Sequence, residues 1–492
     1  MKQKGLLFSF ILSMMFFAVF FQNCGDGFKS ILRDSALSSE NDLEPNAVVA
    51  TMPPFMVNLD SLGGADRFYS VNSRSNGNVI LAGQSEGFSN DNTKDAIIYN
   101  YHPQTRYESY HVIDASPMSN DQFFHMELSE PNKYLASGLS RSSLLTGTTG
   151  GNFTNDGLLV QYNAGSDQIE FAYLIGFIAN NAGWQDIIRG AHKIGDDYFI
   201  IGHHGAANPN SDLWRPFIIR MDATGNIIWA RNLARHFDVR KTAVLNNSIV
   251  LIGSHNDTGA RTGGIYRVNV NGRQLWHVEH LNGGFWNGAV TSNGNILAAG
   301  NQNGNGLLVR FNLNGIAISS KLLVAAQPDN FFGIQEMSDG DIIATAHTES
   351  QGSLDDIDDA LVLRLSPDLE TVRWAKVYGV SGETNRIENA HNIAETSEGQ
   401  IIFSGFSTPD LNTDDADKAF SFSLNSNGEG FVNCNRLQDA TLTLTNNVYN
   451  GSLDNIAVNL ATNPNAVVER LNIAQITRSI DDASLLQRLC TP

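Results

Sequence analysis

The chain has 492 residues, of which 51 are acidic and 32 are basic, so its formal charge at neutral pH is −19. A chain this acidic repels nucleic acid and anionic lipid headgroups, which excludes functions that depend on holding either of them. The partners that it favours are cations, neutral glycans or other proteins, although the same acidity also serves simply to keep an exported protein soluble.

The N-terminus has the pattern of a bacterial export signal. Lys2 and Lys4 precede an apolar stretch over residues 6–21, and polar residues follow from Cys24 onward. The apolar stretch is too short to favour a permanent membrane-spanning helix. We therefore predict that residues 1–23 are a signal peptide that is removed on export.

Cys24 decides between ordinary secretion and lipid attachment. Residues 21–25 resemble the lipobox of bacterial lipoproteins, although Asn23 and Phe21 stand where that motif usually has a small residue and a leucine. The resemblance implies that Cys24 carries fatty acyl chains such as palmitate. Gly25 after it implies delivery to the outer membrane, on either its periplasmic or its outer side. Ordinary secretion and an uncleaved membrane anchor are the alternatives.

Residues 24–52 are predicted to form a flexible tether, because they are rich in Ser, Asp, Asn and Glu and have no sustained apolar period. Such a tether would hold a folded domain away from the membrane. The folded domain is expected over residues 53–432, and a further segment over 433–492.

Seven repeats of one pattern fill the region between Asp66 and Gly428. Each has an apolar stretch, a turn rich in Gly, Asn and Asp, a second apolar stretch that ends in a small residue, a polar loop, and a third apolar stretch. This arrangement, with second stretches that end 46 to 64 positions apart, is typical of four-stranded propeller blades. The closing residues are Gly83, Gly138, Gly202, Gly253, Gly300, Ala346 and Gly405.

The local sequence agrees with antiparallel strands joined by tight turns. Asn-Gly and Asp-Gly pairs, as at residues 293–294 and 339–340, supply the positive φ angles that hairpin turns need. Fourth stretches carry a recurrent tryptophan, at Trp229, Trp276 and Trp374, which is expected to cover the seam to the next blade. The whole unit resembles the β-propeller repeats of exported and surface bacterial proteins, and this resemblance implies a fold but no particular activity.

We therefore predict an all-β protein, a seven-bladed β-propeller of four-stranded antiparallel blades over residues 53–432. Residues 54–59 precede the first full repeat, whereas the seventh repeat has little room for its own fourth strand before Cys434. Residues 54–59 are thus expected to complete blade seven and close the ring. The alternative is that residues 429–432 supply this strand.

Residues 433–492 break the period and are expected to form a small C-terminal appendage that caps the propeller or docks elsewhere. Strands are expected over 441–445 and 456–460, and helical or irregular structure over 465–478 and 483–489.

Cys434 and Cys490 are the two cysteines left once Cys24 is assigned to lipid. They are predicted to form a disulfide in an oxidising compartment and so to clamp this segment. Neither has a second Cys or a His at metal-ligand spacing, which argues against a zinc or redox site.

Ligands are expected on the face that carries the second-to-third and fourth-to-first connections, because the longest and most polar loops lie there. Histidines follow second strands and could ligate a metal, although no fixed spacing supports one. These are His203, His204, His255 and His347. Acids begin the first strands and could ring the mouth of the central channel, to hold a cation or a hydroxyl-rich ligand, or could simply cap turns. These are Asp66, Asp121, Asp238, Asp329 and Glu388.

Two acidic loops offer oxygen ligands for calcium, which is the one cofactor that the sequence leaves open. Neither loop has the twelve-residue spacing of an EF-hand, and an Asp before a strand also accepts backbone hydrogen bonds in turns. The carboxylates are Asp355, Asp356, Asp358 and Asp359 in one loop and Asp414, Asp415 and Asp417 in the other.

The sequence contains no GxSxG elbow, P-loop or HExxH motif. The leading hypothesis is therefore a non-enzymatic lipoprotein, tethered to the outer membrane, that binds a protein or a glycan through one rim of its propeller. One alternative is a hydrolase or lyase that acts on polysaccharide with rim carboxylates as acid and base. Another is a structural scaffold of an envelope assembly. A deep pocket with two facing carboxylates would favour the enzyme.

Overall fold

The computed structural model describes residues 56–59 and 64–487, apart from gaps that lie mostly in loops. The chain divides into residues 1–51, all outside the described residues, and residues 52–492. The signal peptide, Cys24, the tether, Cys434 and Cys490 therefore remain predictions. The larger gaps are 88–92, 116–119, 142–154, 178–183, 207–213, 256–261, 325–328, 349–358, 380–386, 409–416 and 431–436, and shorter ones separate the strands beyond residue 440.

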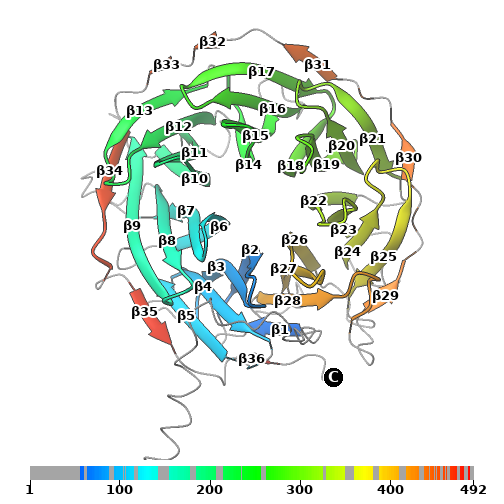
Figure 1. Ribbon diagram of the computed structural model, residues 1–492, viewed down its shortest axis with the longest axis horizontal. Helices are drawn as coiled ribbons and strands as arrows, with labels where there is room; N and C mark the ends of the chain where they lie inside the picture. The colour runs from blue at the N-terminus through cyan, green and yellow to red at the C-terminus, as the bar shows by residue number, and fades with distance from the viewer. Residues whose placement is uncertain are drawn as a thin grey trace, which may run out of the picture. The chain divides into compact units, whose positions relative to one another are not determined.

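Seven antiparallel sheets are arranged in a ring (Figure 1). Four strands form the body of each sheet, or blade. In order from the centre outward they are β2 (Asp66–Ser73), β3 (Val79–Ser85), β4 (Asp95–His102) and β5 (Tyr107–Ile113) in blade one; β6 (Asp121–Glu130), β7 (Lys133–Ser140), β8 (Asp156–Asn163) and β9 (Gln168–Phe177) in blade two; β10 (Trp184–Ile194), β11 (Asp197–Ala206), β12 (Arg215–Met221) and β13 (Ile227–Asn232) in blade three; β14 (Asp238–Val244), β15 (Ser248–His255), β16 (Thr262–Asn269) and β17 (Arg273–His280) in blade four; β18 (Gly283–Val290), β19 (Ile296–Gln302), β20 (Asn305–Phe311) and β21 (Ala317–Leu323) in blade five; β22 (Asp329–Glu336), β23 (Ile342–Thr348), β24 (Asp359–Leu365) and β25 (Val372–Tyr378) in blade six; and β26 (Ile387–Glu395), β27 (Ile401–Thr408), β28 (Lys418–Leu424) and β1 (Met56–Leu59) in blade seven.

The ring is closed in two ways, by contacts among the innermost strands and by the strand that completes blade seven. The innermost strands contact one another in a circle that runs from β2 through β6, β10, β14, β18, β22 and β26 back to β2. Blade seven is completed by β1, which pairs antiparallel with β28 from Met56 opposite Phe422 to Leu59 opposite Ala419. The predicted seven-bladed fold and its closure by an N-terminal strand are therefore confirmed, and the described part of that strand is residues 56–59.

The hydrophobic core lies in the seams between neighbouring blades. Seven clusters of buried side chains are present, each shared by two adjacent blades. Between blades three and four, for example, Phe199 packs in one cluster with Phe237 and Tyr266. Second strands such as β3 are buried along their whole length, which explains why they read as unbroken apolar stretches.

The recurrent tryptophans cover these seams, as predicted. The indole N–H of Trp276 donates a hydrogen bond to the Leu313 carbonyl (3.3 Å), and that of Trp374 donates to the Ser426 carbonyl (3.0 Å). Both carbonyls belong to the turn that follows the third strand of the next blade. The side chains therefore tie each outer strand to its neighbour.

Each innermost strand contains a β-bulge, in which one residue is skipped by the pairing with the second strand. In blade one the small residue opposite the bulge is Gly83, where an added Cβ would lie 1.8 Å from the Arg67 carbonyl oxygen. Six blades have this glycine, which lets the bulged backbone approach closely, and blade six has Ala346 instead. The skipped residues are Tyr69, Phe124, Arg189, Arg240, Trp286, Phe332 and His391.

The C-terminal segment forms a belt of short strands around the outside of the propeller (Figure 1). Its strands pair antiparallel with the outer strand of each blade. In chain order they pair with blade six, then with blades five to one, and finally with blade seven. The belt strands and their partners are β29 (Leu437–Asp439) on β25, β30 (Leu444–Asn446) on β21, β31 (Gly451–Asp454) and β32 (Val458–Asn459) on β17, β33 (Ala461–Thr462) on β13, β34 (Ala466–Arg470) on β9, β35 (Thr477–Ile480) on β5, and β36 (Leu486–Gln487) on β1.

This belt differs from the expected appendage, because it adds a fifth strand to every predicted four-stranded blade. β34 and the first half of β35 are strands within 465–478, and β36 is a strand within 483–489, where helical or irregular structure was expected. The physical reason is that the outer strand of each blade would otherwise present unpaired N–H and C=O groups. Leu444, Leu453 and Val468 of the belt also pack against three of the seam clusters.

Candidate functional site

The seven bulged side chains line the central channel, and we call them the channel ring. They surround a cavity of about 260 Å³, which is also lined by His125, Lys241, Asn287 and Asn392. Because each bulge lies at the same place in its strand, the seven residues come from equivalent positions of the seven blades. The channel ring consists of Tyr69, Phe124, Arg189, Arg240, Trp286, Phe332 and His391.

Most of the channel ring is aromatic, and these side chains contact one another around the channel. The Tyr69 ring centroid lies 5.7 Å from that of Phe124 and 5.5 Å from that of His391. The Phe332 centroid lies 5.3 Å from that of His391 and 6.1 Å from that of Trp286. Contacts of this kind hold the aromatic side chains in fixed positions while leaving them partly exposed to the cavity.

Two arginines complete the channel ring. The guanidinium carbon of Arg189 lies 4.2 Å from the centroid of Phe124, and that of Arg240 lies 4.7 Å from the centroid of Trp286. Arg240 also forms an ion pair with Asp238. Burial, together with repulsion from Arg240, lowers the pKa of Arg189 to about 10, so Arg189 is charged at neutral pH.

A polar network adjoins the channel ring on strands β6, β10 and β14. Glu127 accepts from His125 Nε2 (3.1 Å) and lies 2.9 Å from His192 Nδ1. Lys241 Nζ donates to His125 Nδ1 (3.0 Å). Burial alone would raise the pKa of Glu127, but the two histidines outweigh it and hold that pKa well below its usual range. Burial also lowers the pKa of His125 to about 4 and that of Lys241 to about 8.

The acids predicted at the channel mouth are buried at the starts of the innermost strands and are not among the residues that line the cavity. Asp121 Oδ2 accepts a hydrogen bond from the Ala115 amide (2.8 Å), and Glu388 Oε1 accepts one from the Ser407 hydroxyl (3.3 Å). Asp238 contacts the channel ring through its ion pair with Arg240. Asp66 and Asp329 are fully buried in the same position of their blades.

The predicted histidines do not converge. His203 packs on Trp214, with ring centroids 4.5 Å apart, whereas the adjacent His204 packs on Phe177 at 4.9 Å. His255 Nδ1 lies 2.8 Å from the carbonyl oxygen of His236. His347 accepts from the Asn330 amide (2.7 Å) and lies with its ring centroid 5.0 Å from that of Phe332 of the channel ring.

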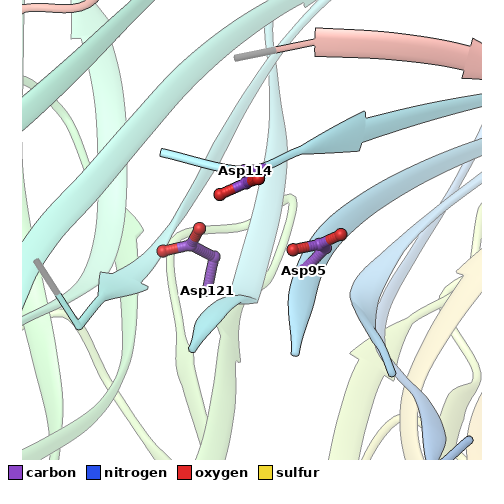
Figure 2. Close-up of side chains that lie close together, drawn as sticks. All are labelled: Asp95, Asp114 and Asp121. Carbon is purple, nitrogen blue, oxygen red and sulfur yellow. The ribbon is translucent and has the colours of Figure 1, made fainter. Parts of the chain in front are cut away.

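Three carboxylates of blades one and two gather at one point of the part of the chain that the structure describes. Asp95 begins β4, Asp114 follows β5 and Asp121 begins β6, and one oxygen of each lies within 4.8 Å of the others. Figure 2 shows the three side chains close together. Carboxylate oxygens are the ligands that calcium prefers, but three are fewer than the six to eight that it takes. Of the acids predicted to bind calcium, Asp359 and Asp417 are described, and both are buried. The other five lie outside the described residues.

The channel ring was missed by sequence reasoning, although a signal for it is present. In blades one, two, six and seven the ring residue stands three positions after the predicted acid, as Tyr69 does after Asp66 and His391 after Glu388. Arg240 stands two positions after Asp238. An aromatic or cationic residue two or three positions after the acid in five of the repeats is the pattern that would have located the channel.

Comparisons with known proteins identify no relative by sequence. No family model and no curated protein matches the chain. Among solved structures the chain is similar to phage phi92 endosialidase, with a TM-score of 0.41 and 8% identity, over 77% of this chain and 70% of that one. It is also similar to Sqt1 from Chaetomium thermophilum, with a TM-score of 0.41 and 12% identity, over 75% of this chain and 100% of that one. At these values the matches carry no argument about function.

Within the part of the chain that the structure describes, no helix has the length and apolar character needed to cross a membrane.

Proposed function

We propose that this protein is a non-enzymatic propeller that binds a glycan in its central channel, and that acyl chains on Cys24 hold it at the outer membrane. The channel ring carries the proposal. Aromatic faces such as those of Trp286 and Phe332 suit the apolar C–H faces of sugar rings, and the Asn287 and Asn392 amides in the same lining suit hydroxyl groups. The cavity volume of about 260 Å³ fits a single sugar ring better than a protein segment.

The lining of the cavity also favours binding over glycoside hydrolysis. Hydrolysis with acid and base carboxylates needs two such groups across the scissile bond. The described residues that line the cavity include no Asp or Glu, and Glu127 in the adjoining network is held between two histidines. A scaffold that docks through residues 433–492 is a weaker alternative, because the belt uses its backbone hydrogen bonds to pair with the propeller itself.

A glycan array probed with residues 25–492 tests the binding proposal, and Trp286→Ala is the decisive variant. For glycans that bind the natural chain, the variant is expected to lose about fivefold in affinity, because it removes one aromatic face, a contact worth on the order of 1 kcal/mol. Titration calorimetry with the strongest glycan measures this loss.

The matched control is Tyr107→Ala, which removes an aromatic side chain that is 52% exposed on the outer strand β5. Affinity should be unchanged in this variant. The proposal is wrong if the array shows no bound glycan, or if the two variants weaken binding equally.

Lipid attachment is tested separately, by labelling cells with a fatty acid. We expect the label on the natural chain and not on Cys24→Ala, which should also leave the membrane fraction, because stable anchoring needs at least two acyl chains. Equal labelling of the two proteins would contradict the proposal, whereas Cys434→Ser should keep the label.

A further inference from the structure

We propose that the cationic side of the cavity, formed by Arg189, Arg240 and Lys241, binds a carboxylate, so that the ligand of the channel is an acidic sugar such as a uronate. This inference rests on the proposed glycan function and names its ligand class. It also departs from the sequence analysis, in which the net charge of −19 favoured neutral glycans and cations.

The first argument is that the two guanidinium groups are held in place but keep hydrogen-bond donors free. Arg189 lies over Phe124 and Arg240 over Trp286, so that both arginines are oriented by stacking. The Nε groups of both are buried and have no hydrogen-bond partner among the residues that the structure describes. The planar fork of a guanidinium group is suited to the two oxygens of a carboxylate.

The second argument is the local balance of charge. Arg189, Arg240 and Lys241 supply three positive charges, and Asp238 and Glu127 supply two negative ones, which leaves one positive charge in excess. Asp238 pairs with Arg240, and no described carboxylate lies within ion-pair distance of Arg189. An excess cation in a partly desolvated cavity is costly unless an anion compensates it.

The third argument is that the same cavity has both positive charge and aromatic side chains in its lining. Its volume is also close to that of one sugar ring. Arg189 and Arg240 are flanked in the channel ring by Phe124 on one side and Trp286 on the other. A carboxylate bound between the arginines therefore places the rest of the ligand against the aromatic side chains. A simple inorganic anion would use the cationic side alone.

The cationic side also predicts how affinity depends on pH. Lys241 lies against His125, Glu127 and the adjoining Arg240, and burial lowers its pKa to about 8. The charged form of Lys241 favours the anion, and it is lost as the pH rises through 8. The affinity for an acidic sugar is therefore expected to fall between pH 7 and pH 9, and binding at pH 8 should take up a fraction of a proton.

The test compares D-glucuronate with D-glucuronamide, which has the same ring and no charge, by NMR titration of residues 25–492. The natural chain is expected to bind the acid at least tenfold more tightly than the amide. Arg189→Gln should bring this ratio close to one, and Arg189→Lys should restore part of it, since lysine keeps the charge and loses the fork. Arg373→Gln, which changes an arginine that is half exposed on β25, should leave the ratio unchanged.

The outcomes separate the two proposals. If the acid and the amide bind equally well, the carboxylate site is wrong and the glycan function stands. If neither sugar binds, and the array shows no bound glycan, both are wrong. Inorganic phosphate that displaces glucuronate at a lower concentration than acetate does would overturn the assignment to a carboxylate. Thermal unfolding of each variant shows whether the fold is intact.

Discussion

Deletion of residues 433–492 is expected to prevent the propeller from folding, because the belt covers the outer edge of every blade. Each of its half-buried apolar side chains contributes about 1 kcal/mol, so that their loss costs on the order of 10 kcal/mol. That equals the total stability of a typical domain. The apolar belt residues are Leu437, Ala440, Leu442, Leu444, Tyr449, Leu453, Ala466, Val468 and Leu471.

Soluble yield and thermal unfolding followed by circular dichroism measure this effect. Stepwise truncation in a reducing buffer, where the predicted disulfide cannot form, provides the control. A chain that ends at residue 484 lacks β36, whose pairing with β1 involves two residues, and in this buffer it should lose little. A chain that ends at residue 465 also lacks β34 and β35 and should be much less stable. A deletion of 433–492 that stays soluble and melts within about 2 °C of the full chain would refute a structural role for the belt.

The two ends of residues 52–492 stabilise different parts of the ring. β1, from the start, completes blade seven and is hydrogen bonded to β28, from the end of the repeats. The belt then pairs with blades that were completed hundreds of residues earlier, as in the pairing of Thr477 with Ile113. The outer strand of every blade therefore depends on the belt for its pairing partner. Until the belt has been synthesised and has paired, these strand edges can pair with wrong partners.

The repeats could be predicted from sequence because the period of each blade is local. The unbroken apolar second strands, the turn glycines and the closing small residues all lie within one repeat, so the seven blades and their closure by residues 54–59 followed. The belt could not be predicted in the same way. Its strands have only two to five residues, and their partners are set by edges far away in the sequence.

The channel site was harder to predict than the fold. The acids at the starts of the innermost strands were found, but their side chains are buried in contacts such as that of Asp121 with the Ala115 amide. The side chains that face the channel do so because of the bulge, and a bulge shifts the alternation of a strand by one residue. Simple alternation along β2 or β14 therefore does not show that Tyr69 or Arg240 lines the cavity.

A disulfide between Cys434 and Cys490 is expected to close the belt into a hoop around the propeller. The described belt begins with β29 on blade six and ends with β36 on blade seven, which are neighbours. Cys434 stands three residues before β29 and Cys490 three residues after β36 in the sequence, and three residues of chain reach at most about 10 Å. The described belt thus starts and ends on adjacent blades, and we predict that the two cysteines pair there.

Formation of this bond removes two protons and two electrons from the two thiols, which a thiol–disulfide exchange protein of an oxidising compartment accepts. In the chain-entropy model a loop of this length contributes roughly 4 kcal/mol to the stability of the fold. Reduction of the natural chain and the substitution Cys434→Ser should lower the unfolding temperature equally. Reduction should have no further effect on the variant. Mass mapping of the unreduced protein decides the pairing, since two free thiols would show that the belt is held by its strand pairing alone.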